Sequence, residues 1–92
     1  MGRRHEGGHP IFVSGIGTGS RTGPGVVTSV LVGVGATSAV VKIYDGTSAS
    51  GTQIAQITAT AAFYCELDAV CKTGCFVDVS GGAAIVTVTY DS

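Results

Sequence analysis

Residues 26–34 decide the fold class, and they read Val26-Val27-Thr28-Ser29-Val30-Leu31-Val32-Gly33-Val34. The stretch is dominated by valine, and its side chains alternate with a period of two, which is typical of a β-strand with one buried face. The residues expected together on one face are Val26, Thr28, Val30, Val32 and Val34. Those expected on the opposite face are Val27, Ser29 and Leu31.

Similar short strands are predicted along the rest of the chain, at residues 11–13, 38–45, 53–58, 63–67, 75–79 and 84–90. Turn residues separate them, including Asp45-Gly46 and Ser80-Gly81-Gly82, and residues 68–74 are also expected to form a turn. No segment has the pattern of a helix. We therefore expect an all-β fold, either a small antiparallel β-sandwich or a jelly-roll-like barrel.

The first quarter of the chain differs from the remainder in composition. Residues 1–25 contain eight glycines and carry Arg3, Arg4 and Arg21 against Glu6, a net charge of +2. Residues 26–92 carry two lysines against five acidic residues, a net charge of −3. We therefore predict an extended, basic, glycine-rich N-terminal arm over residues 1–25 and a β-sandwich body over residues 26–92.

Composition argues against several classes of partner. Charged residues make up 12% of the chain, and three dispersed arginines are too few for a nucleic-acid-binding tail. No apolar stretch reaches the length of a membrane-spanning helix, and no apolar segment follows the charged N-terminus as in a signal peptide. We expect a protein made in the cytoplasm that contacts neither nucleic acid nor membrane.

Two motifs suggest chemistry, but their contexts do not support it. His5-Glu6-Gly7-Gly8-His9 matches the H-E-x-x-H pattern of zinc proteases, yet Gly-Gly and Pro10 prevent the helix that this motif needs. The Gly15-x-Gly17-x-Gly19 run lacks the lysine or third spaced glycine of a phosphate-binding loop, and arm flexibility explains it better. We expect no catalytic, cofactor-binding or metal-binding residues, and no enzymatic activity.

The three cysteines are Cys65, Cys71 and Cys75, and their spacing is not that of a zinc site. Cys65 is expected on the face of Phe63 and Leu67, and Cys75 on the face of Val77 and Val79. Reduced, buried thiols are the expected state for a protein made in the cytoplasm. The alternative is one disulfide, either Cys71–Cys75 or Cys65–Cys75.

Two stretches resemble small all-β virion proteins of tailed bacteriophages, which decorate or cement the head or form knobs and fibres on it. They are Val41-Lys42-Ile43-Tyr44-Asp45-Gly46-Thr47-Ser48-Ala49-Ser50-Gly51-Thr52 with Ile54-Ala55, and Val79-Ser80-Gly81-Gly82-Ala83-Ala84-Ile85-Val86-Thr87-Val88-Thr89-Tyr90. The resemblance covers about residues 26–90. It implies a capsid decoration or cement protein, located in the virion, that binds the major capsid protein or another virion protein as a homo-oligomer, with a trimer favoured.

Under this resemblance the arm would bind the partner. Arg3, Arg4 and Arg21 would meet acidic faces of the shell, and Ile11-Phe12-Val13 would add a strand to a neighbouring sheet. The sheet edges have few lysines or prolines to guard them, which also favours oligomerisation. The alternative function is a binding module of a phage fibre, tail or neck that contacts another virion protein or a host receptor or glycan.

Overall fold

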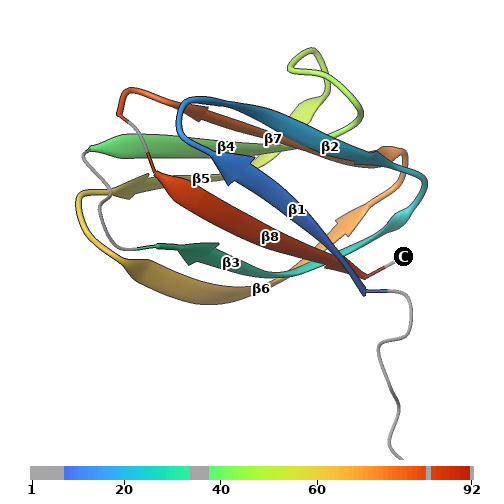
Figure 1. Ribbon diagram of the computed structural model, residues 1–92. Coiled ribbons are helices and arrows are strands. Elements are labelled where there is room, and N and C mark those ends of the chain that lie inside the picture. Colours follow the sequence, from blue (N-terminus) through green and yellow to red (C-terminus); the bar gives the residue numbers. More distant parts are fainter. Residues whose placement is uncertain (1–7, 34–37, 83, 92) are drawn as a thin grey trace, which may run out of the picture.

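The computed structural model describes residues 8–33, 38–82 and 84–91, which form two antiparallel four-stranded sheets packed face to face (Figure 1). The prediction of an all-β fold built from antiparallel strands is therefore confirmed, and the described residues contain no helix. The strands are β1 (Gly8–Ser14), β2 (Gly17–Thr22), β3 (Gly25–Val32), β4 (Ala39–Asp45), β5 (Thr52–Ala59), β6 (Phe63–Cys71), β7 (Gly74–Ser80) and β8 (Ile85–Asp91).

In both sheets, strands from the first half of the chain alternate with strands from the second half. One sheet, here called sheet A, has the order β1-β8-β3-β6, and the other, sheet B, has the order β2-β7-β4-β5. Only the β4–β5 connection stays within one sheet, and every other connection crosses between the two. The antiparallel pairs β1–β8, β2–β7, β3–β6 and β4–β5 give the strand order of an eight-stranded jelly roll.

The core is a thin layer of aliphatic side chains between the sheets. Val41 and Ile43 point inward from β4 while Lys42 and Tyr44 point outward, as the two-residue period of a strand requires. The largest fully buried side chains are Tyr90, Ile43, Val27, Val30, Val32, Val41, Val77, Val79, Val86, Val88, Cys71 and Cys75. Because valine supplies most of this layer, its β-branched side chains hold the sheets together with little conformational freedom to lose.

The facing of β3 differs from the prediction because the strand contains a β-bulge. The pairings of β3 with both β6 and β8 shift register between Val27 and Ser29. One extra residue at this point reverses the alternation, so Val27 is buried together with Val30 and Val32. Thr28 lies at the bulge, where its hydroxyl donates a hydrogen bond of 3.3 Å to the carbonyl oxygen of Thr89.

Two segments of the expected arm, residues 1–25, form strands in the structure. Residues 8–14 pair with β8, and residues 17–22 pair with β7, so both segments belong to the sandwich. Within β2, close packing rather than flexibility explains Gly19. A Cβ atom on Gly19 would lie 2.9 Å from Cγ2 of Ile11 and 3.2 Å from Cγ2 of Val13. Residues 1–7 of the expected arm lie outside the described residues.

Strand β6 is longer than predicted. It continues through Asp68 to Cys71, where a turn was expected, and the turn itself is confined to Lys72 and Thr73. Ala69 and Cys71 continue the inward-facing series of Cys65 and Leu67, whereas Asp68 and Val70 face outward. The regular alternation, including an inward Ala69, shows that the polar residues of this segment belong to an exposed strand face.

Replacing Gly19 with alanine is expected to destabilise the fold by about 1–3 kcal/mol, because the added methyl group would overpack the Ile11 and Val13 side chains. The measurement is the free energy of unfolding from urea denaturation of both proteins.

Gly17→Ala is the matched control, since a Cβ there would lie 3.9 Å from Val13, an ordinary contact. It should stay within about 0.5 kcal/mol of the original protein. Equal destabilisation by the two substitutions would contradict the packing explanation.

Candidate protein-binding face

The outer face of sheet A carries four residues in register across its four strands, and three of them have large, largely apolar side chains. Phe12 on β1 pairs with Thr87 on β8, Thr87 pairs with Leu31 on β3, and Leu31 pairs with Tyr64 on β6. Phe12 is 61% exposed, Leu31 47% and Tyr64 55%. These exposed fractions matter because they place three large side chains in one register across the sheet, with Thr87 between Phe12 and Leu31, rather than scattered over the surface. We call Phe12, Leu31 and Tyr64 the apolar row.

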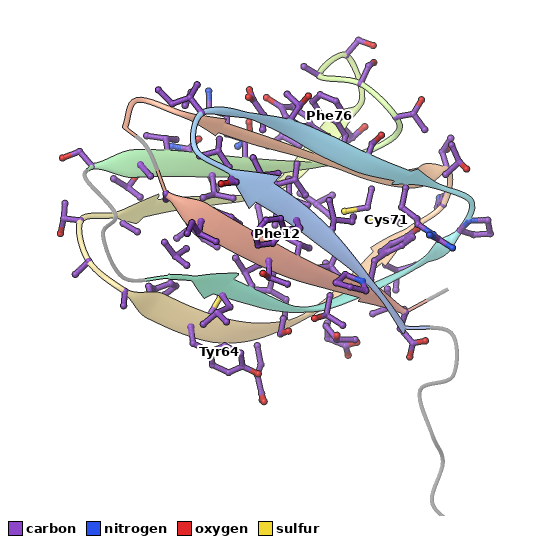
Figure 2. The ribbon with its side chains drawn as sticks, in the orientation of Figure 1. Phe12, Tyr64, Cys71 and Phe76 are labelled. Carbon is purple, nitrogen blue, oxygen red and sulfur yellow. The ribbon has the colours of Figure 1, made fainter. Side chains whose placement is uncertain are left out.

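The row follows from the alternation of each strand. Ile11 and Val13 point into the core and are only 4% exposed, so Phe12 between them must point outward. Figure 2 shows Phe12 on β1 and Tyr64 extending away from the body at β6. Pro10 and Ile85 are exposed on the same face of sheet A, two residues from Phe12 and Thr87 respectively.

Acidic residues flank the apolar row. Glu66 and Asp68 are exposed on β6, and the hydroxyl of Tyr64 donates a hydrogen bond of 3.3 Å to Oε2 of Glu66. The described lysines and arginine lie elsewhere, with Arg21 on β2, Lys42 on β4 and Lys72 in the β6–β7 turn. The face therefore suits a partner that is apolar at its centre and neutral or basic at its rim.

The outer face of sheet B is more polar. One row across it consists of Thr18, Asp78, Lys42 and Gln56, and the next consists of Ser20, Phe76, Tyr44 and Gln53. The Phe76 and Tyr44 rings contact each other with centroids 6.0 Å apart and planes tilted by 57°. Since these two half-buried rings cover each other, sheet B presents less free apolar surface than sheet A.

The residues with shifted pKa values gather at one end of the sandwich, around the β6–β7 turn. Asp45, the last residue of β4, accepts hydrogen bonds from the backbone N–H groups of Lys72 and Thr73, each 3.0 Å long. These bonds stabilise the carboxylate and lower the pKa of Asp45. The N–H of Gly46 donates to the carbonyl oxygen of Gly74 at 3.1 Å, so the start of the β4–β5 loop is tied to the same turn.

Tyr90 extends this network to sheet A. Its buried hydroxyl donates a 2.6 Å hydrogen bond to the carbonyl oxygen of Gly23, and the N–H of Gly23 donates to the carbonyl oxygen of Thr73 at 2.8 Å. Burial raises the pKa of Tyr90 to about 12. The carboxylate of Asp45 and the hydroxyl of Tyr90 are therefore both hydrogen-bonded to backbone groups of the same chain.

Cys71 and Cys75 lie in the same end of the core, and Figure 2 shows Cys71 between the sheets. Both thiols are fully buried and hydrogen-bonded to each other. Burial, together with the neighbouring thiol, raises the pKa of Cys75 to about 12, and burial also raises the pKa of Cys71. Thiols used as nucleophiles need the opposite shift, because the thiolate is the reactive form. The raised pKa values keep both thiols protonated in the core.

The structure separates the residues predicted to bind a partner. Ile11 and Val13 lie in the core of their own chain and pair with Val88 and Val86 of β8, so only Phe12 of this segment is available to a partner. Arg21 is exposed on β2, next to Cys75 of β7. Arg3 and Arg4 lie outside the described residues. The rest of the apolar row, Leu31 and Tyr64, was missed, because neither the β3 bulge nor the pairing of distant strands is visible in the sequence.

The geometry distinguishes between the two candidate disulfides. All three cysteines are free thiols, and Cys65 is half-buried in the middle of β6, opposite Val30. Cys71 ends the same strand, so the extended backbone places it about 20 Å from Cys65. Since Cys75 contacts Cys71, the Cys71–Cys75 pairing is the one that the fold can accommodate.

The described residues contain no group of three or more potential metal ligands, and no helix that could cross a membrane. The H-E-x-x-H match ends in a strand, because His9 lies in β1 opposite Tyr90, while His5 and Glu6 lie outside the described residues. Comparison of the chain with known protein families, with curated proteins and with solved structures found no match.

Acid is expected to weaken the fold through Asp45. A pKa lowered by folding means that the carboxylate stabilises the protein above its ordinary value of 3.8, and that this contribution is lost as the pH falls through the lower, folded value. Asp45→Asn should therefore be less stable than the original protein at pH 6 and should lose less stability between pH 5 and pH 2.

Urea midpoints across this pH range measure the effect. Asp68→Asn is the control, since Asp68 is exposed on the outer face of β6. If both variants show the same pH dependence, the Asp45 network does not stabilise the turn.

In the native protein, Cys65 is expected to react with a thiol reagent faster than Cys71 or Cys75, by a factor on the order of 100, because the buried pair is kept protonated. Refolding with a small-molecule disulfide should join Cys71 to Cys75 by exchange, releasing two small-molecule thiols. The short enclosed loop would add roughly 2 kcal/mol of stability.

Peptide mapping identifies the alkylated and paired residues. Cys65→Ser should still form the disulfide and Cys71→Ser should not. A Cys65–Cys75 product from the folded protein would contradict the observed geometry.

Proposed function

We propose that this chain is a structural virion protein, a capsid decoration or cement protein of a tailed bacteriophage, which binds the outside of the head and stabilises the shell. The observation that carries the proposal is the apolar row across sheet A, with Phe12, Leu31 and Tyr64 all about half exposed or more. A chain of 92 residues that leaves such a row exposed is suited to docking on another protein.

The chemistry of the body supports the same function. The four side chains whose pKa values are shifted lie together around the β6–β7 turn, where they are part of the structure: Asp45, Cys71, Cys75 and Tyr90. The resemblance of residues 41–55 and 79–90 to phage decoration proteins adds a specific setting, and jelly rolls occur among viral capsid proteins. The proposed partner is the major capsid protein or another virion protein.

The mechanism would be mechanical. The row would bury its apolar surface against adjacent capsid subunits, and Glu66 and Asp68 beside it would favour a basic rim on the shell. Because the protein would bind only the assembled shell, its binding free energy would shift the equilibrium away from the open or burst state. In this arrangement Phe12, which was predicted to lie in the arm, would contact the capsid as part of sheet A.

Leu31→Ser is expected to weaken binding to heads at least about 10-fold, because burying this side chain contributes on the order of 1.5–3 kcal/mol. Purified protein is mixed with heads that lack it, from the phage that carries this gene, and bound protein is measured by co-sedimentation. Heads with bound protein should also resist a higher temperature before they release DNA.

The matched control is Ile16→Ser, since Ile16 is 65% exposed in the β1–β2 connection, away from the row. It should bind as the original protein does. Equal weakening by both variants rules out docking through the row, and no binding to heads rules out the decoration function. Binding to isolated tails, necks or host glycans instead would favour the alternative of a fibre, tail or neck binding module.

A further inference from the structure

The two sides of the sandwich are closed to different extents. On the side of β1 and β2, Ile11 and Val13 are buried because Gly19 lets the strands approach closely. On the side of β5 and β6, most inward-facing apolar residues are only partly covered. These half-buried residues are Ile54, Ala55, Ile57, Cys65, Leu67 and Ala69. The core is thus partly open along β5 and β6.

Strand β5 is also the least protected edge of the described sheets. The four edge strands are β1, β2, β5 and β6. Three of them contain the residues that usually discourage further pairing, namely Pro10 on β1, Arg21 on β2, and Glu66 with Asp68 on β6. Strand β5 reads Thr-Gln-Ile-Ala-Gln-Ile-Thr-Ala and has neither charge nor proline. An uncharged edge beside a partly open core is suited to receiving another strand.

We propose that a second copy of this chain binds along β5, forming a two-fold dimer in which residues 55–59 of the two copies pair antiparallel. The β4–β5 register shifts between Ile43 and Tyr44, which leaves Ile54 as an extra residue and residues 55–59 as the regular part of the edge. The dimer would join the two B sheets into one eight-stranded sheet.

The residues of this segment are complementary to themselves when paired around Ile57. Ile57 then faces Ile57 of the second copy, Ala55 faces Ala59, and Gln56 faces Thr58. The apolar residues Ala55, Ile57 and Ala59 all lie on the core side, where the contact covers the partly exposed residues of both copies. Gln56 and Thr58 are exposed on the outer side and can hydrogen-bond across the axis.

Strand β6 is the weaker candidate for self-pairing. Its exposed Glu66 and Asp68 would come close to the same carboxylates of the second copy, and like charges opposite each other destabilise a strand pair. The absence of charge therefore favours β5 over β6 as the pairing edge. A second copy is favoured over an unrelated strand because the β5 edges of two copies have the same length and a matching pattern of side chains.

The expected dimer is small. The molecule is 17 Å thick, and the five paired residues of β5 span about 17 Å, so each copy buries on the order of 300 Å². The total, roughly 600 Å², falls below the standard size of stable interfaces. We therefore expect a dissociation constant in the range of about 1–100 μM. A two-fold dimer differs from the trimer that the resemblance to phage virion proteins favoured.

The dimer would leave both apolar rows free. A two-fold axis that relates antiparallel edge strands runs perpendicular to the sheet, so the outer faces of both A sheets point to the same side. Two docking rows on one side would bind a repetitive surface more strongly than one row does. This consequence rests on the proposed function, whereas the dimer itself does not.

The test is sedimentation velocity of the full chain from roughly 1 to 500 μM, a range chosen to span the expected dissociation constant. The double variant Gln56→Glu with Thr58→Glu places like charges opposite each other twice across the axis. It should raise the dissociation constant about 10-fold. Position 56 lies beside Lys42 of β4 within the same chain, so a carboxylate there is compensated and the monomer itself should fold.

The matched control is the double variant Gln56→Glu with Thr58→Lys. Here the carboxylate introduced at position 56 of each copy faces the ammonium group introduced at position 58 of the other copy. This pair of substitutions should retain or strengthen the dimer. As a second readout, alkylation of half-buried Cys65 should slow as the concentration rises, while that of buried Cys71 stays slow throughout.

Three results would overturn the proposal: a monomer at every concentration, a trimer, or equal dissociation constants for the two double variants. The outcome is independent of head binding, because no capsid is present in the experiment. A dimer that binds no heads would leave this inference standing and remove the proposed function.

Discussion

The hydrogen bonds that Asp45 accepts from Lys72 and Thr73 fasten the β6–β7 turn to the end of β4, and this is where the two sheets are tied together. The chain crosses from sheet A to sheet B at the β6–β7 turn, and Asp45 ties that turn to β4 of sheet B. Gly23 and Tyr90 connect the same turn to the β2–β3 crossing and to β8. A thin core of valines supplies most of the apolar burial, and this network ties the two sheets together at one end of the sandwich.

The two long sides of the sandwich are closed to different extents. Gly19 on β2 lets Ile11 and Val13 pack against the strand backbone, which seals the side formed by β1 and β2. On β5 and β6 most inward-facing apolar residues are only partly covered, so the core is partly open there. The molecule therefore has three surfaces of different character: an apolar face on sheet A, a more polar face on sheet B and an open, uncharged edge at β5. The two proposals, docking and dimerisation, use different surfaces and are compatible.

Titratable groups and large apolar side chains occupy different places in this protein. The buried thiols of Cys71 and Cys75 are held protonated, and the Asp45 carboxylate and Tyr90 hydroxyl are bound to backbone groups. Exposed apolar side chains, in contrast, are aligned in register across sheet A. This contrast between four internally bound polar groups and an exposed apolar row is the basis of the proposed docking role.

The sequence by itself determined the all-β class, most strand positions and the inward facing of Val41 and Ile43, because a period of two is a local property of each strand. It did not reveal β2, since a strand made of glycine, serine and threonine has no apolar alternation, nor the bulge at Thr28, which reversed the facing of Val26 and Val27. Only the tertiary structure placed Phe12, Leu31 and Tyr64 in one row and brought Cys71 to Cys75. These contacts join residues far apart in the chain or on different sheets, and they are set by strand register and sheet packing rather than by local pattern.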